Sequence, residues 1–291
     1  MSIRYHNIQE YNIKRAIFYG CSNTAGSELA DADIFDMSLK EVNTLKMRYG
    51  PFNWNTQLYG KVAAMLDPVS SELAIDRYEK LCNQYSYAKH LSDMLSVEYV
   101  NFAEPGTSQK KILFNILSDI ANGYYKDGDV VFIGATSPVR DMIIDEEGNV
   151  YDFIMSHRHT LKKLEPLYDA LIQINNEYQV ALNNMIILRS IQTALHQENV
   201  PHIFIETHPY IPYPDDPHSH HSNLKFLKTK TDIDLIKRLK TIYQDTFDRL
   251  NFVPVGSMYK YTGERCAYGH AGIEAHKMFA TEIYDYLIKP K

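Results

Sequence analysis

The stretch RAIFYGCSNTAG, residues 15–26, runs from an apolar segment into a tight turn that carries a serine. Aliphatic and aromatic residues dominate Arg15–Gly20, which predicts a buried strand. A glycine-flanked turn after such a strand presents a side-chain oxygen beside backbone N–H groups at the start of the next helix. This arrangement suits a nucleophile whose reaction intermediate needs nearby donors, so Ser22 is the first candidate functional residue.

Outward from this stretch, strand-like and helix-like segments alternate. The other predicted strands are Val97–Ala103, Val130–Gly134 and His202–Thr207, and the predicted helices are Tyr87–Leu95, Ser108–Ala121, Leu161–Glu198 and Ala271–Leu287. Alternation of this kind predicts an α/β fold with a mostly parallel sheet that helices cover on both faces. We expect one domain over residues 1–291.

Two segments interrupt the alternation. Residues 31–83 contain Gly-Pro and Asp-Pro pairs among short helical patches, and we interpret them as a helical insertion after the first strand. Residues 209–222, PYIPYPDDPHSHHS, are rich in proline and lack periodicity, which indicates a surface loop after the fourth strand. Loops at the carboxyl ends of parallel strands are where such sheets bind ligands.

Charge and cysteine content narrow the class of protein. A formal net charge of -6 gives no excess of basic residues with which to neutralise phosphates, so neither a nucleic-acid partner nor an anionic membrane is expected. The three cysteines are widely spaced, which favours a reducing compartment, and we expect a cytoplasmic protein. No segment approaches the roughly 18 apolar residues of a membrane helix. No cofactor is expected, and a homo-oligomer remains an open alternative.

Four blocks, taken in order, resemble the SGNH (GDSL-like) hydrolase superfamily. They are GCSNTAG at 20–26, NFAEPGTS at 101–108, GATSPVR at 134–140 and AYGHAGIEAH at 267–276. The first is similar to divergent members in which GDSxTxG becomes GCSxTxG. The resemblance implies a three-layer α/β/α, flavodoxin-like sandwich with a parallel sheet.

The resemblance also implies roles for individual residues. It places the nucleophile on Ser22 and an oxyanion-hole N–H on Gly106. Thr136 occupies the place of the family's oxyanion asparagine, and a threonine hydroxyl is a shorter donor that rotates freely. The oxyanion hole would thus comprise Ser22, Gly106 and Thr136. Arg140 could hold a substrate anion, although an arginine after a strand is more often a surface ion-pair partner.

The fourth block places the general base on His270. Ala267 stands where the family has the aspartate that orients this base, so another group must fix the histidine tautomer. Glu264 and Asp216 are the candidates for the orienting acid. His276 is expected to pack or hydrogen-bond near the start of the last helix rather than to react.

From these residues we expect a serine hydrolase that cleaves an ester or thioester by acyl transfer. A small-molecule or glycan ester, with an acetyl or other short acyl group, is the favoured substrate class.

Three alternatives compete with this interpretation. The first is a weak or inactive binding protein with the SGNH fold, which Thr136 and Ala267 favour. The second is a nucleotide or phosphate binder that uses the turn at 20–26, although this turn has no lysine. The third is a metal-dependent hydrolase that uses the histidines near the 209–222 loop, His208, His218, His220 and His221, but a proline-rich loop is a poor scaffold for a metal, and no metal is predicted. Cys21, beside Ser22, is expected to be a buried structural thiol.

Overall fold

Four parallel strands form the central sheet of the protein, as seen in a computed structural model that describes residues 11–27, 29–30, 40, 80–137, 140–148, 150–154, 177–207, 241, 249–250, 252–261, 265–266 and 270–288. The strands are β1 (Arg15–Tyr19), β2 (Glu98–Asn101), β3 (Asp129–Ala135) and β6 (His202–Glu206), in the order β2-β1-β3-β6. Phe204 of β6 also forms a parallel bridge with Phe252. The predicted parallel α/β sheet is confirmed, and its order is that of a flavodoxin-like fold.

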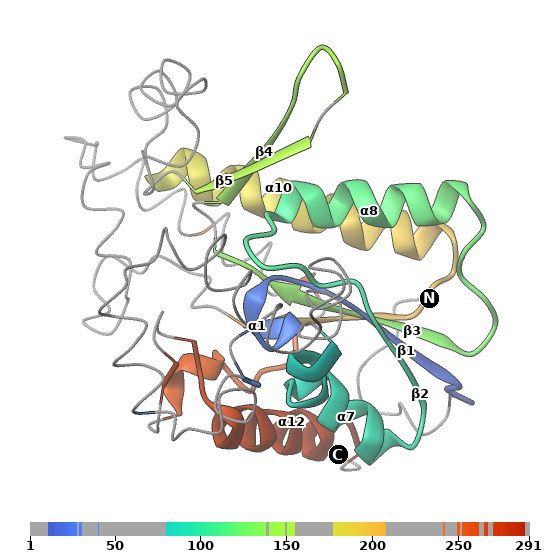
Figure 1. The fold of residues 1–291 in the computed structure, drawn as a ribbon. Helices are drawn as coiled ribbons and strands as arrows, with labels where there is room; N and C mark the ends of the chain where they lie inside the picture. Colours follow the sequence, from blue (N-terminus) through green and yellow to red (C-terminus); the bar gives the residue numbers. More distant parts are fainter. Residues whose placement is uncertain are drawn as a thin grey trace, which may run out of the picture.

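Helices cover both faces of the sheet, which gives three layers (Figure 1). One face packs against α8 (Gln109–Ala121) and α10 (Glu177–Gln197), and the other against α7 (Tyr87–Leu95) and α12 (Ile273–Ile288). A short α1 (Ser22–Ala25) follows β1, and a 3-10 helix, η5 (Met258–Lys260), precedes α12.

The alternation of side chains along each strand builds the two cores. Ala16, Phe18 and Phe132 belong to the cluster with α7 and α12, and the Phe18 and Phe132 rings stack with centroids 4.8 Å apart. Ile17 and Val131, the residues between them in register, belong to the cluster with α8 and α10. A strand that is buried on both faces reads as a continuous apolar run, which is why these strands were recognisable in the sequence.

Serine residues set where two of the covering helices begin. The side-chain oxygens of Ser86 and Ser108 accept hydrogen bonds of 3.2 Å from the backbone N–H groups of Lys89 and Lys111. Such N-caps satisfy one of the donors that the first turn of a helix leaves unpaired. Helix α8 therefore begins at Gln109, one residue after its predicted start, because Ser108 is the cap.

An antiparallel hairpin was not predicted from the sequence. Strands β4 (Arg140–Ile144) and β5 (Val150–Ile154) pair with each other and form a separate two-stranded sheet (Figure 1). A turn in which the Gly148 N–H donates to the Asp145 carbonyl connects the two strands. The insertion at 31–83, apart from residues 40 and 80–83, lies outside the described residues, as do the loop at 209–222 and the first part of the predicted helix at 161–198.

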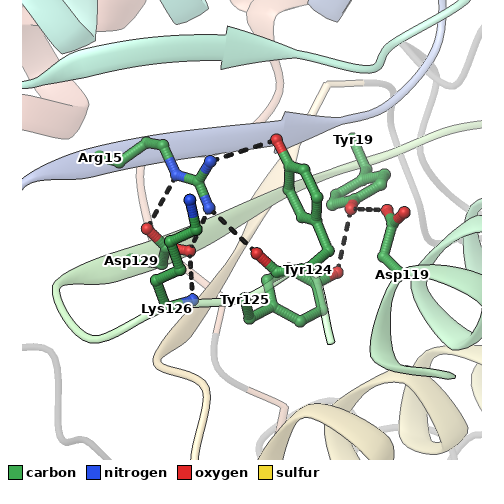
Figure 2. A network of polar contacts seen from close by, with 7 residues as sticks. All are labelled: Arg15, Tyr19, Asp119, Tyr124, Tyr125, Lys126 and Asp129. Atoms are coloured by element: carbon green, nitrogen blue, oxygen red, sulfur yellow. Dashed lines mark hydrogen bonds and ion pairs between the residues drawn. The ribbon is translucent and has the colours of Figure 1, made fainter. Parts of the chain in front are cut away.

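A charged network joins the amino ends of β1 and β3 (Figure 2). Arg15 Nε donates to Asp129 Oδ1 at 2.8 Å, and Arg15 also contacts Tyr124. The Asp129 carboxylate accepts a further hydrogen bond of 2.8 Å from the Lys126 N–H. Both members of the pair are largely buried, with side-chain exposures of 11% for Arg15 and 4% for Asp129. A buried pair with this many partners holds two neighbouring strands in register.

Candidate active site

Ser22 begins helix α1, directly after the buried strand β1. The Ala25 N–H donates to the Cys21 carbonyl and the Ser27 N–H donates to the Ser22 carbonyl, both at 2.9 Å, so this turn is held by its own backbone. Ser22 is only 3% exposed, and Cys21 is fully buried, as expected of a structural thiol. The serine thus lies just below the surface at the carboxyl end of the sheet.

Thr24 explains why glycines flank this turn. A Cβ atom added to either Gly20 or Gly134 would lie 2.2 Å from Thr24 Oγ1, far inside van der Waals contact. The Thr24 hydroxyl also lies 3.1 Å from the Tyr87 hydroxyl of α7. The threonine therefore fills the space between the ends of β1 and β3, and two glycines allow it to do so.

His270 lies against Ser22, although 248 residues separate the two in sequence. The distance between His270 Nε2 and Ser22 Oγ is 2.8 Å, which is hydrogen-bonding distance. The His270 carbonyl accepts a hydrogen bond of 3.0 Å from the Cys266 N–H, beside the bridge between Arg265 and Ala271. The structure thus brings together the two residues on which the sequence prediction depends most, in an arrangement that suits a nucleophile and its base.

His276 has a different environment. It is fully buried on α12, and its Nδ1 accepts a hydrogen bond of 3.0 Å from the Tyr87 N–H. Burial above all, and then electrostatic interaction with His270 and His90, lowers the pKa of His276 to about 3. A neutral histidine in this position links α12 to the start of α7, so its interpretation as a packing and hydrogen-bonding residue is confirmed.

The loop after β2 carries Gly106 and is tied to the serine turn. Asn101 Nδ2 donates to the Thr24 carbonyl at 3.1 Å, and Asn101 Oδ1 accepts from the Ala103 N–H at 3.0 Å. Gly106 has a φ of 84°, a backbone conformation that favours glycine. The oxyanion role of Gly106 stays a prediction. Asn101, which was given no role from the sequence, connects this loop to Thr24, two residues after Ser22.

Thr136 follows β3 at the same end of the sheet and is fully buried. Its carbonyl accepts a hydrogen bond of 3.3 Å from Gln109 Nε2, and its hydroxyl oxygen accepts one of 3.1 Å from Arg140 Nη1. Arg140 is half-buried at the start of β4. Arg140 was predicted to bind a substrate anion, and Thr136 was predicted to stabilise the oxyanion. One donor of Arg140 is directed at the Thr136 hydroxyl.

A second group of polar residues was missed by sequence analysis. Asn23 Nδ2 lies 3.4 Å from both the Thr207 carbonyl and the Tyr259 hydroxyl. The Arg265 guanidinium lies over the Tyr259 ring, 5.1 Å from its centroid. Burial raises the pKa of Tyr259, and the positive charges of Arg140 and Arg265 are among the effects that oppose this rise. No local pattern indicates this group, because 236 residues separate Asn23 from Tyr259.

Several predicted residues lie outside the described part of the chain. They include both candidate orienting acids, Glu264 and Asp216, together with Ala267 and the histidines His208, His218, His220 and His221. Within the described ranges, no group of three or more histidine, cysteine, aspartate or glutamate residues is placed to hold a metal ion. In the same ranges no helix combines the length and the apolar character needed to span a membrane.

No protein-family model matches the sequence, and no curated protein does. Among solved structures, it is similar to a protein of the G-D-S-L family from Desulfitobacterium hafniense DCB-2, with 9% identity, a TM-score of 0.42 and coverage of 94% of this chain and 99% of the other. It is also similar to an acetyl xylan esterase from the rumen bacterium Butyrivibrio proteoclasticus, with 13% identity, a TM-score of 0.43 and coverage of 94% and 63%.

Proposed function

We propose that this protein is a serine hydrolase that cleaves an ester or thioester by acyl transfer, with Ser22 as nucleophile and His270 as base. The observation that carries the proposal is the 2.8 Å distance between His270 Nε2 and Ser22 Oγ. A serine hydroxyl is a weak nucleophile until a neighbouring base accepts its proton, and this imidazole nitrogen is within reach of that proton.

The reaction would proceed in two halves. Ser22 Oγ forms a bond to the acyl carbon as its proton moves to His270 Nε2, and the carbonyl π electrons become an oxyanion. The C–O or C–S bond then breaks, and His270 returns the proton to the leaving group. A water molecule repeats the sequence on the acyl-enzyme and releases the acid. We assign stabilisation of the oxyanion to the Ser22 N–H, Gly106 and Thr136.

In the described part of the chain, a backbone hydrogen bond fixes the segment that carries His270. The Cys266 N–H holds the His270 carbonyl, and the neutral His276 lies close by on the same segment. Glu264 and Asp216 stay the candidates for an orienting acid. If neither fills that role, a Ser–His dyad with a lower turnover is the expected form of the enzyme.

A short acyl group, such as acetyl, on a carbohydrate is the substrate class that we propose. The sequence contains 22 tyrosines, a residue type whose ring can stack on a sugar. The three buried cysteines, Cys21, Cys82 and Cys266, support a reducing compartment, and we propose a cytoplasmic location.

The decisive experiment compares wild type with Ser22→Ala in p-nitrophenyl acetate hydrolysis and in labelling by a fluorophosphonate probe. Wild type should hydrolyse the ester and be labelled, and Ser22→Ala should lose both properties. Ser27→Ala, a serine-to-alanine change in the same turn, is the matched control and should keep both. Equal activity in wild type and Ser22→Ala would remove the nucleophile, and a wild type that neither turns over nor labels would favour the binding-protein alternative.

A further inference from the structure

The hydrogen bond between Arg140 and Thr136 bears on how this site stabilises an oxyanion. Thr136 lies at the carboxyl end of β3, which pairs with β1, so it follows the strand next to the one that leads to Ser22. Arg140 begins β4. Because carboxyl ends of neighbouring parallel strands lie together, Thr136 and Ser22 belong to one site.

The backbone at Thr136 is held on both sides. Gln109 Nε2 donates to the Thr136 carbonyl at 3.3 Å, and the Thr207 hydroxyl donates to the preceding carbonyl, that of Ala135, at 2.7 Å. Arg140 is held as well, since the hairpin that it begins is joined to α8 by an ion pair between Lys110 and Asp141. The contact between Arg140 and Thr136 thus connects two anchored segments.

The direction of this hydrogen bond is fixed by chemistry. A guanidinium group has only donors, so the Thr136 oxygen must accept from Arg140 Nη1 over the 3.1 Å that separates them. The hydroxyl hydrogen then points away from Arg140. A hydroxyl that accepts from a cation is also polarised and becomes a better donor through its own hydrogen.

We propose that Arg140 is a positioning residue that orients and polarises the Thr136 hydroxyl toward the oxyanion formed at Ser22. This inference rests on the proposed acyl-transfer function and deepens it. A threonine in this position lacks the fixed donor geometry of an amide, and the guanidinium supplies that geometry by restricting the rotation of the hydroxyl. Thr136 keeps its proton throughout, while the proton of Ser22 passes to His270 and on to the leaving group.

Neutral and anionic substrates separate this role from direct binding of a substrate anion. On neutral p-nitrophenyl acetate, Thr136→Val should lower kcat about 100-fold with little change in KM, because one oxyanion donor is lost. Arg140→Ala should lower kcat by about 10-fold on the same substrate, since the donor remains but is no longer oriented. Thr136→Ser keeps the hydroxyl and should stay within a few-fold of wild type.

A double mutant tests whether the two residues act as one unit. Thr136→Val combined with Arg140→Ala should be no slower than Thr136→Val alone. Added guanidinium chloride should restore part of the activity of Arg140→Ala but not that of the double mutant. Ser92→Ala is the matched control: it removes a buried hydroxyl that donates to the Ala88 carbonyl within α7, outside the contacts of the site, and kcat should stay within about 2-fold of wild type.

Several outcomes would overturn the proposal. One is full kcat in Thr136→Val. Another is a rise in the KM of an anionic ester as the only effect of Arg140→Ala, with an effect that is additive to that of Thr136→Val in the double mutant. This result would make Arg140 a substrate-binding residue. In both cases wild type is active, so the proposed function stands. A wild type without ester turnover or probe labelling would overturn the function and this inference together.

Discussion

At the amino ends of the strands, opposite charges are paired, whereas at the carboxyl ends hydroxyls, amides and an imidazole meet. Arg15 and Asp129 tie β1 to β3 at the first end, beside a cavity of about 500 Å³ that Tyr11, Gly128 and Val200 help to line. Ser22 and His270 meet at the other end. Each end is polar, and among the described residues the carboxyl end is where a serine hydroxyl lies 2.8 Å from an imidazole nitrogen. The difference teaches that the charged pair is placed to join two strands, whereas the serine and the histidine meet as the proposed acyl-transfer function requires.

Removal of the base at the carboxyl end should have the largest effect. We expect His270→Ala to lower kcat on p-nitrophenyl acetate by about 10³-fold, because general-base catalysis contributes on the order of 10² to 10⁴. The imidazole is half-buried and its ring contact with Ser22 is not part of either core cluster, so the urea midpoint should stay close to that of wild type. An active His270→Ala would show that the contact with Ser22 has no catalytic meaning.

The opposite pattern is expected at the amino end. Asp129→Asn leaves the largely buried Arg15 without its ionised partner, and we expect a loss of about 3 kcal/mol in the free energy of unfolding. The kcat of the folded fraction should not change, because the network lies away from Ser22. Asp127→Asn is the control: Asp127 is fully exposed and 3.9 Å from Lys14 Nζ, and its loss should leave urea unfolding unchanged. A fall in kcat for Asp129→Asn would break the comparison.

Close packing beneath the serine turn can be tested through Gly134. Its substitution by alanine puts a methyl group against Thr24 Oγ1, and we expect a destabilisation of about 2 kcal/mol. Thr24→Ala removes the group that the new methyl group meets. Urea unfolding should therefore show that the double variant loses less free energy of unfolding than the two single variants, Gly134→Ala and Thr24→Ala, lose in sum. Simple additivity would mean that Thr24 does not fill this space.

The smallest effect concerns pH. The pKa of buried His276 is about 3, and its ordinary value is 6.5, so the unfolded chain binds more protons than the folded chain between these values. Stability that is present above about pH 6.5 is therefore lost as the pH falls toward 3, by about 2 kcal/mol between pH 6.5 and 5. Burial also lowers the pKa values of His90 and His202, which adds to the same trend.

Urea unfolding at pH 7 and pH 5 measures this loss, and His276→Gln should reduce it because the substituted side chain does not titrate. Equal pH dependence in the variant would assign the loss to other groups.

The sequence predicted the strands of the parallel sheet from their β-branched and aromatic residues, and it predicted α7 and α12 from their apolar spacing. It missed the β4–β5 hairpin. Strand β4 carries charged and half-buried residues and so lacks the apolar signal of a buried strand.

By itself the sequence determined that Ser22 follows a buried strand, in a glycine-flanked turn, because periodicity and turn chemistry are local. Only the tertiary structure decided that His270 Nε2 faces Ser22 Oγ and that Arg140 holds Thr136. It alone also placed Asn23 beside Tyr259. Contacts over more than 200 residues depend on how the layers pack, and a geometry of a few ångströms is set by side chains from several elements at once.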